Sequence, residues 1–169
     1  MRKLILTLLF IISLASTVYS IPVAVWHFDE CNGTTAFDAT GNGNTGTLQN
    51  GVTWTTDSVL GCALQFDGLD DLVTVPYSTI INPPNQIKIE ALIKRNSNAD
   101  GSVISKNGPY YLGIINNKVD GRVYTNDGNC PTSCPNPNTW AFVSGTTDLQ
   151  IGQWYHLTMT YDGSHMNVY

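Results

Sequence analysis

The sequence predicts an all-β protein, a sandwich of two antiparallel sheets or a jelly roll, and three observations lead to this prediction. Short runs of alternating apolar and polar residues recur along the chain, as expected of strands that bury one face. Turn sequences rich in Asn-Gly, Asp-Gly and Pro separate these runs. No run of ten or more residues carries the 3.6-residue apolar stripe of an amphipathic helix.

The strands follow one another at short intervals. A first strand is predicted at 23–29, where Ala24, Trp26 and Phe28 would share one face. Further strands are predicted at 62–66, 72–75, 86–94, 102–105, 110–115, 121–125, 140–143, 153–161 and 166–169. In 86–94 the isoleucines at 87, 89 and 93 would face the core, opposite Lys88 and Glu90.

The composition supports the strand pattern and limits the class of partner. The 169-residue chain has 8 basic and 13 acidic residues, and only Glu30 and Glu90 of the acids are glutamates. Strong helix formers are therefore scarce at positions that a solvated helix would use. A formal net charge of −5, without a Lys/Arg cluster, excludes nucleic acid and anionic membrane surfaces as expected partners.

The first twenty residues have the pattern of a secretory signal peptide. Arg2 and Lys3 precede an apolar segment at 4–15, and Val18-Tyr19-Ser20 places small residues at the −3 and −1 positions of a cut after Ser20. The apolar segment is too short to span a bilayer. We expect a secreted or cell-surface protein whose mature domain, 21–169, keeps six of the eight basic residues and has a charge of about −7.

The four cysteines fit an oxidising compartment. Cys31, Cys62, Cys130 and Cys134 are an even number and allow three pairings. We favour the disulfides Cys31–Cys62 and Cys130–Cys134, the second of which would close the short loop CPTSC. A zinc site is the alternative, but no second Cys/His pair with ligand spacing accompanies it.

The order of several motifs resembles a known family. The segments are WHFDE (26–30), AFDATGNGNTGTL (36–48), ALQFDGLDDLVTVP (63–76), IKIEALIK (87–94) and WYHLTMTYDGSHMNVY (154–169). Together they resemble a LamG-like (laminin G type 3-like) domain of the concanavalin A-like lectin/glucanase jelly rolls. The resemblance implies a two-sheet antiparallel jelly roll over 21–169, in a superfamily of extracellular binding modules and some glycosidases. Family domains usually continue beyond the segment that matches HMNVY, so we expect this domain to be incomplete at its C-terminal end.

One acidic loop is a candidate calcium site. Glu30 is followed by the glycine-rich turn DATGNGN at 38–44, and carboxylates with exposed turn carbonyls suit a hard cation such as Ca²⁺. The resemblance also implies a structural Ca²⁺ near these positions, with Glu30, Asp38 and Asn42 as expected ligands. The alternative is a plain turn capped by Asp38. A second acidic segment, FDGLDD at 66–71, is interpreted as a hairpin turn rather than a metal site.

The residues do not predict catalysis. Glycosidases need two carboxyl groups that flank the scissile bond, and glucanases of this fold carry a Glu-x-Asp-x-Glu run on one strand. Glu90 instead has Lys88, Leu92 and Lys94 as its neighbours on the strand. There is also no G-x-S-x-G around a serine and no H-E-x-x-H.

The remaining binding signal is aromatic. Trp54, Tyr110, Tyr124 and Trp140 lie near turns, where their rings would either pack under a loop or be exposed for stacking on a sugar. The sequence therefore predicts a non-catalytic module that binds a glycan or an extracellular protein in adhesion or substrate targeting. Two alternatives remain, a fragment of a secreted glycoside hydrolase or other enzyme, and a structural repeat of a surface protein.

Overall fold

A computed structural model of the chain describes residues 21–82, 86–106, 108–125 and 139–169. The expected signal peptide at 1–20 and the expected pair Cys130–Cys134 lie outside these residues. The described residues form strands, turns and irregular segments without a helix, so they contain no helix that could cross a membrane.

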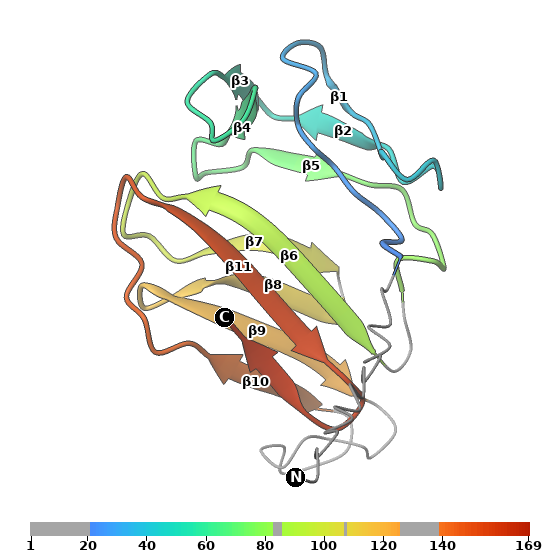
Figure 1. Cartoon of the computed structure of the whole chain (residues 1–169), viewed down its shortest axis with the longest axis vertical. Helices are drawn as coiled ribbons and strands as arrows, with labels where there is room; N and C mark the ends of the chain where they lie inside the picture. Colours follow the sequence, from blue (N-terminus) through green and yellow to red (C-terminus); the bar gives the residue numbers. More distant parts are fainter. Residues whose placement is uncertain (1–20, 83–85, 107, 126–138) are drawn as a thin grey trace, which may run out of the picture.

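The strands of the described part follow in chain order (Figure 1). They are β1 (Thr35–Ala36), β2 (Gly46–Gln49), β3 (Thr53–Thr55), β4 (Ala63–Gln65), β5 (Leu72–Thr74), β6 (Ile87–Lys94), β7 (Gly101–Lys106), β8 (Tyr110–Ile115), β9 (Lys118–Thr125), β10 (Thr139–Ser144), β11 (Trp154–Tyr161) and β12 (Met166–Val168). All the pairings between them are antiparallel, which confirms the predicted fold class.

Two larger sheets are stacked on each other. One has the order β10-β9-β8-β7 and the other the order β12-β11-β6. Figure 1 shows β6 and β11 in front of the four-stranded sheet, with the N-terminal strands at the far end of the long axis. These N-terminal strands form the sheets β1-β2-β5 and β3-β4.

The core lies between the two larger sheets. β6 and β11 pair over their whole length, from Trp154 opposite Lys94 to Tyr161 opposite Ile87. Because facing residues point to the same side, every second residue of each strand reaches the core, as predicted for β6. The buried apolar side chains of this core are Ile89, Leu112, Ile114, Val119, Val123, Leu149, Leu157, Met159 and Tyr161.

A tight turn and a buried arginine fix one end of the four-stranded sheet. Asn116 and Asn117 connect β8 to β9 with φ values of 51° and 63°, as in a two-residue type I′ hairpin turn. Both terminal nitrogens of Arg95 donate to Asn117 Oδ1 at 3.1 Å, and its Nη1 also donates to the Leu149 carbonyl at 3.0 Å. The buried guanidinium therefore links this turn to the loop before β11.

The predicted strand at 23–29 is wrong, because this segment bonds mainly to side chains and makes one backbone hydrogen bond, from Ala39 N to the Val25 carbonyl, instead of pairing with a neighbouring strand. The Val23 carbonyl accepts hydrogen bonds from Asn42 Nδ2 and Asn44 Nδ2, at 3.0 and 3.1 Å. Phe28 has a φ of 55°, which interrupts an extended backbone. The other predicted strands are confirmed within a few residues at their ends, whereas β1, β2 and β3 were not predicted.

Candidate functional site

Asp38 organises the loop that was expected to hold calcium. Its Oδ1 accepts from Val25 N at 3.1 Å, Thr40 N at 3.0 Å and Thr40 Oγ1 at 2.7 Å. Its Oδ2 accepts from the backbone N and the Nδ2 of Asn44, both at 3.0 Å. Burial raises the pKa of Asp38, but the hydrogen bonds from Thr40, Val25 and Asn44 outweigh it and hold this pKa well below its usual range. The carboxylate is thus an anionic anchor for the 38–44 turn.

Glu30 and Asn42 each bond to a backbone group other than those held by Asp38. The Glu30 carboxylate accepts the backbone N–H of Phe37 at 2.6 Å, while Asn42 is bound to the Val23 carbonyl. Two acceptor atoms of the region, Glu30 Oε2 and Asn44 Oδ1, are buried without a donor among the described residues. No direct hydrogen bond joins Glu30 to Asp38 or Asn42 within the described part.

A compact acidic cluster lies between β4 and β5. One carboxylate oxygen each of Asp67, Asp70 and Asp71 falls within 4.8 Å of the others. Asp71 Oδ2 accepts the Asp67 backbone N–H at 2.9 Å, and Asp71 Oδ1 is buried without a donor among the described residues. The interpretation of this segment as a hairpin turn is wrong, because β4 pairs with β3 and β5 pairs with β2, so the turn connects two sheets.

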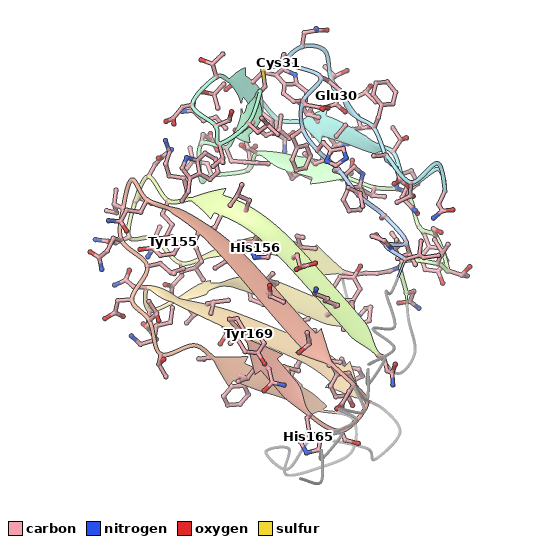
Figure 2. The ribbon with its side chains drawn as sticks, viewed as in Figure 1. Glu30, Cys31, Tyr155, His156, His165 and Tyr169 are labelled. Carbon is pink, nitrogen blue, oxygen red and sulfur yellow. A yellow bond between two sulfur atoms is a disulfide. The ribbon has the colours of Figure 1, made fainter. Side chains whose placement is uncertain are left out.

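The predicted Cys31–Cys62 disulfide is confirmed. The two Cα atoms are 5.5 Å apart, and the bond joins the loop before β1 to the residue that precedes β4. Figure 2 shows Cys31 beside Glu30 among the N-terminal loops. The disulfide therefore fixes the N-terminal loops to one another.

The outer face of β6 and β11 carries a small cluster of charges. Glu90 Oε1 lies 3.0 Å from Lys88 Nζ and 3.6 Å from His156 Nε2, and all three side chains are exposed. In Figure 2, Glu30 lies well away from His156 along the long axis of the molecule. The ion-pair partners of Glu90 are therefore Lys88 and His156, and the fold does not bring Glu30 close to Glu90 as a second carboxyl group.

A different surface gathers aromatic rings, on the outer face of the sheet β10-β9-β8-β7. The cross-strand register aligns alternate residues on this side, with Trp140 opposite Tyr124 and Phe142 opposite Arg122. Arg122 in turn faces Tyr111 of β8. We call this surface the aromatic face and define it by Tyr111, Asp120, Arg122, Tyr124, Trp140, Phe142 and Ser144.

Three rings of the aromatic face are open to solvent. Phe142 is 60% exposed, Trp140 42% and Tyr124 39%. The rings of Tyr124 and Trp140 meet edge to face, with centroids 5.6 Å apart and planes at 67°. Tyr124 and Trp140 were expected to be either packed or exposed, and they are exposed. Phe142 was missed, although its alternation with Trp140 along the strand indicated it.

The rest of the aromatic face is a linked set of polar groups. Arg122 Nε donates to Asp120 Oδ1 at 2.5 Å, and Ser144 Oγ donates to Asp120 Oδ2 at 2.8 Å. The Arg122 guanidinium lies 5.3 Å from the centroid of the Tyr111 ring. Burial raises the pKa of Tyr111, and the opposing charge of Arg122 lowers it by less.

A glycine lets the Tyr111 ring lie flat on the sheet. Tyr111 Oη donates to the Gly101 carbonyl at 3.1 Å. A Cβ on Gly113 would lie 2.1 Å from this Oη, so a larger residue does not fit under the ring. The sequence signal for Arg122 and Asp120 was only their alternation along β9, because their further partners, Tyr111 and Ser144, lie on β8 and β10.

Comparison with known proteins identifies the family. Residues 66–169 match a family model, Laminin_G_3, described as the concanavalin A-like lectin/glucanases superfamily. No curated protein and no solved structure gives a significant match. Laminin G-like domains are typically non-catalytic, extracellular modules that bind carbohydrate or protein, and the superfamily also includes glycosidases. The match covers more than half of the chain and agrees with its all-β architecture, so the chain belongs to the concanavalin A-like lectin/glucanases superfamily.

Proposed function

We propose that the chain is a secreted or cell-surface, non-catalytic module that recognises glycans through the aromatic face. The observation that carries this proposal is the set of exposed rings of Tyr124, Trp140 and Phe142 on the outer side of the sheet β10-β9-β8-β7. Sugars stack their apolar C–H surfaces on such rings, while nearby polar groups set their orientation. The family, the Cys31–Cys62 disulfide and the signal-like N-terminal sequence support an extracellular role in adhesion or targeting.

The charge cluster of the other sheet favours binding over hydrolysis. A glycosidase places two carboxyl groups on either side of the scissile bond. Glu90 instead has Lys88 and His156 as its ion-pair partners, and Thr158 faces it across the sheet. Release of reducing sugar from soluble β-glucans by the purified protein would contradict this part of the proposal.

Binding is tested with an array of neutral and charged glycans and the purified protein. We expect at least one glycan class to bind, and we expect W140A and F142A each to weaken that binding by about tenfold, the amount lost with one stacked ring. L92A is the matched control, because Leu92 is also exposed but lies on the outer face of β6. Absence of binding to every glycan, or equal loss in all three variants, would overturn the proposal.

We further propose that a structural Ca²⁺ ion stabilises the N-terminal loops through Glu30, Asp38 and Asn42. Oxygen ligands suit this ion, and the buried, donor-free Oε2 of Glu30 and Oδ1 of Asn44 are acceptor atoms with no other partner among the described residues. Asp38 already accepts five hydrogen bonds, so its main contribution would be its negative charge. The cluster Asp67–Asp70–Asp71 is the competing site.

Calorimetry and thermal melting with Ca²⁺ separate the two sites. We expect Ca²⁺ to raise the melting temperature of the wild type, as any ligand that binds only the native state does. E30Q should abolish this shift, whereas D70N should leave it unchanged. The reverse result would assign the ion to the aspartate cluster, and a melting temperature insensitive to Ca²⁺ would refute both sites.

A further inference from the structure

The aromatic face holds one cationic group in a fixed position. Arg122 is restrained on two sides, by the hydrogen bond from its Nε to Asp120 and by the ring of Tyr111 beneath it. Asp120 is itself only 3% exposed and is held through its second oxygen by Ser144. The orientation of the guanidinium is therefore set by the protein before any ligand arrives, which reduces the entropy lost on binding.

The outer edge of this guanidinium has no hydrogen-bond partner among the described residues. Its Nε is used by Asp120, but Nη1 and Nη2 donate to no acceptor among the described residues. The Arg122 side chain is 39% exposed, so it is partly open to solvent. A planar pair of N–H donors matches the two oxygens of a carboxylate, which it can bind with two parallel hydrogen bonds.

Exposed rings stand next to this donor pair. Phe142 lies directly opposite Arg122 across β10 and β9, and the Trp140–Tyr124 pair lies two residues further along the same two strands. Successive residues on one face of a strand are about 7 Å apart, roughly the span of one sugar ring. A ligand that covers the Arg122–Phe142 pair and the Tyr124–Trp140 pair would thus contact a cation and Phe142 at one end and two further aromatic rings at the other.

We propose that the aromatic face binds an acidic saccharide, a glycan whose uronic-acid carboxylate pairs with Arg122 while adjacent sugar rings stack on Phe142 and Trp140. This inference rests on the proposed glycan-binding function and names its ligand class. The charge of Arg122 is partly balanced by its ion pair with Asp120, so the reason to prefer a carboxylate-bearing glycan over a neutral one or a second protein is the planar pair of N–H donors that Asp120 leaves unused. The acidic cluster of residues 67–71 lies between β4 and β5, at the opposite end of the long axis from β9 and β10 (Figure 1), where its repulsion of an anionic ligand is screened.

The test compares oligogalacturonate with the same oligosaccharide after reduction of its carboxyl groups to neutral alcohols. The full chain should bind the acidic form about ten- to a hundredfold more tightly, the range expected for a charge-assisted, two-pronged hydrogen bond. R122K keeps the charge but loses the planar fork, and R122Q loses both, so the preference should fall in that order. K88Q is the matched control, because it removes one exposed cation from the other sheet and should leave the preference unchanged.

The outcomes distinguish the inference from the proposal on which it rests. Equal binding of the acidic and the reduced oligosaccharide, or stronger binding of a sulfated glucan than of oligogalacturonate, would refute carboxylate recognition and leave glycan binding in place. Binding of no glycan at all would refute both. An acidic preference that survives in R122Q would show that Arg122 serves only to support Tyr111. Thermal melting of each variant verifies that the loss does not come from unfolding.

Discussion

Both nitrogens of Asn44 donate to the same carboxylate oxygen of Asp38, each at 3.0 Å from Oδ2. Asn44 is almost fully buried, and its side chain also donates to the Val23 carbonyl. The Asn44 carbonyl accepts the indole N–H of Trp26 at 2.7 Å. A polar cluster thus takes the place of a strand ladder in connecting the N-terminal segment to the turn at 38–44.

Replacement of Asp38 by Asn should destabilise the native state. The amide of the variant would keep one acceptor oxygen. Its NH₂ group would face N–H or O–H donors that bond to the second carboxylate oxygen in the wild type, and these donors would lose their acceptor. We expect a loss of about 2–3 kcal/mol in the free energy of unfolding, measured with urea at pH 7. D29N is the control, because the exposed Asp29 carboxylate makes no hydrogen bond among the described residues, and it should change stability by less than about 0.5 kcal/mol. A D38N variant as stable as D29N would contradict the role of this anchor.

The lowered pKa of Asp38 makes its contribution to stability depend on pH. Because the folded-state pKa lies below the unfolded value of about 3.9, the native state binds this proton less tightly than the unfolded state does. The stabilisation is therefore fully present above about pH 4 and is lost as the pH falls towards the folded pKa. The difference in unfolding free energy between wild type and D38N should be constant from pH 5 to 7 and should shrink below about pH 4. If the difference in unfolding free energy between wild type and D38N grew below pH 4, the lowered pKa of Asp38 would be contradicted.

Removal of the Cys31–Cys62 disulfide should loosen the N-terminal loops. The bond spans 31 residues of sequence, and a closed loop of that length restrains the unfolded chain by about 3–4 kcal/mol. The double variant C31A/C62A should therefore melt at a lower temperature than the wild type under non-reducing conditions. Limited proteolysis should then cut the N-terminal loops first, whereas the core strands β6, β8, β9 and β11 stay protected. Unchanged melting would show that non-covalent contacts alone hold these loops.

The alternation of apolar and polar residues correctly predicted the strands that bury one face. It gave a wrong prediction where a segment bonds to side chains instead of to a neighbouring strand. Strands β6 and β8 to β11 were recognised because apolar residues recur at every second position, whereas β7, with its register shift, places the adjacent Val103 and Ile104 against the core. The segment 23–29 shows the same alternation, but its carbonyl and amide groups bond to Asp38, Asn42 and Asn44. These bonds span 13 to 21 residues, and no local pattern reveals them. β1, β2 and β3 have four residues or fewer, so alternation gives only a weak signal there, whereas the equally short β4 and β5 lie within the longer alternating runs 62–66 and 72–75.

The sequence predicted only part of the candidate site, because the remaining contacts also join residues that are far apart in the chain. Tyr124 and Trp140 were singled out as aromatic residues near turns, and the Cys31–Cys62 bond followed from cysteine usage. The link between Arg122, Tyr111 and Phe142 depends on the register of three strands. Register is set by turn geometry and by the fit of the whole core, so it cannot be derived from any one of the strands.

Replacement of Gly113 by Ala should disrupt the aromatic face from below. A Cβ at this position would lie 2.1 Å from Tyr111 Oη and 2.5 Å from the Gly101 carbonyl oxygen, so the Tyr111 ring must move and its hydrogen bond must break. We expect a loss of about 1–3 kcal/mol in the free energy of unfolding and weaker glycan binding, because Arg122 loses the ring that supports it. G101A is the matched control, since a Cβ there meets nothing within 4 Å. The folded fraction of G113A is measured by thermal melting, and its binding is compared at a temperature where it is fully native. A G113A protein as stable as G101A would show that the Tyr111 ring does not lie across the strand.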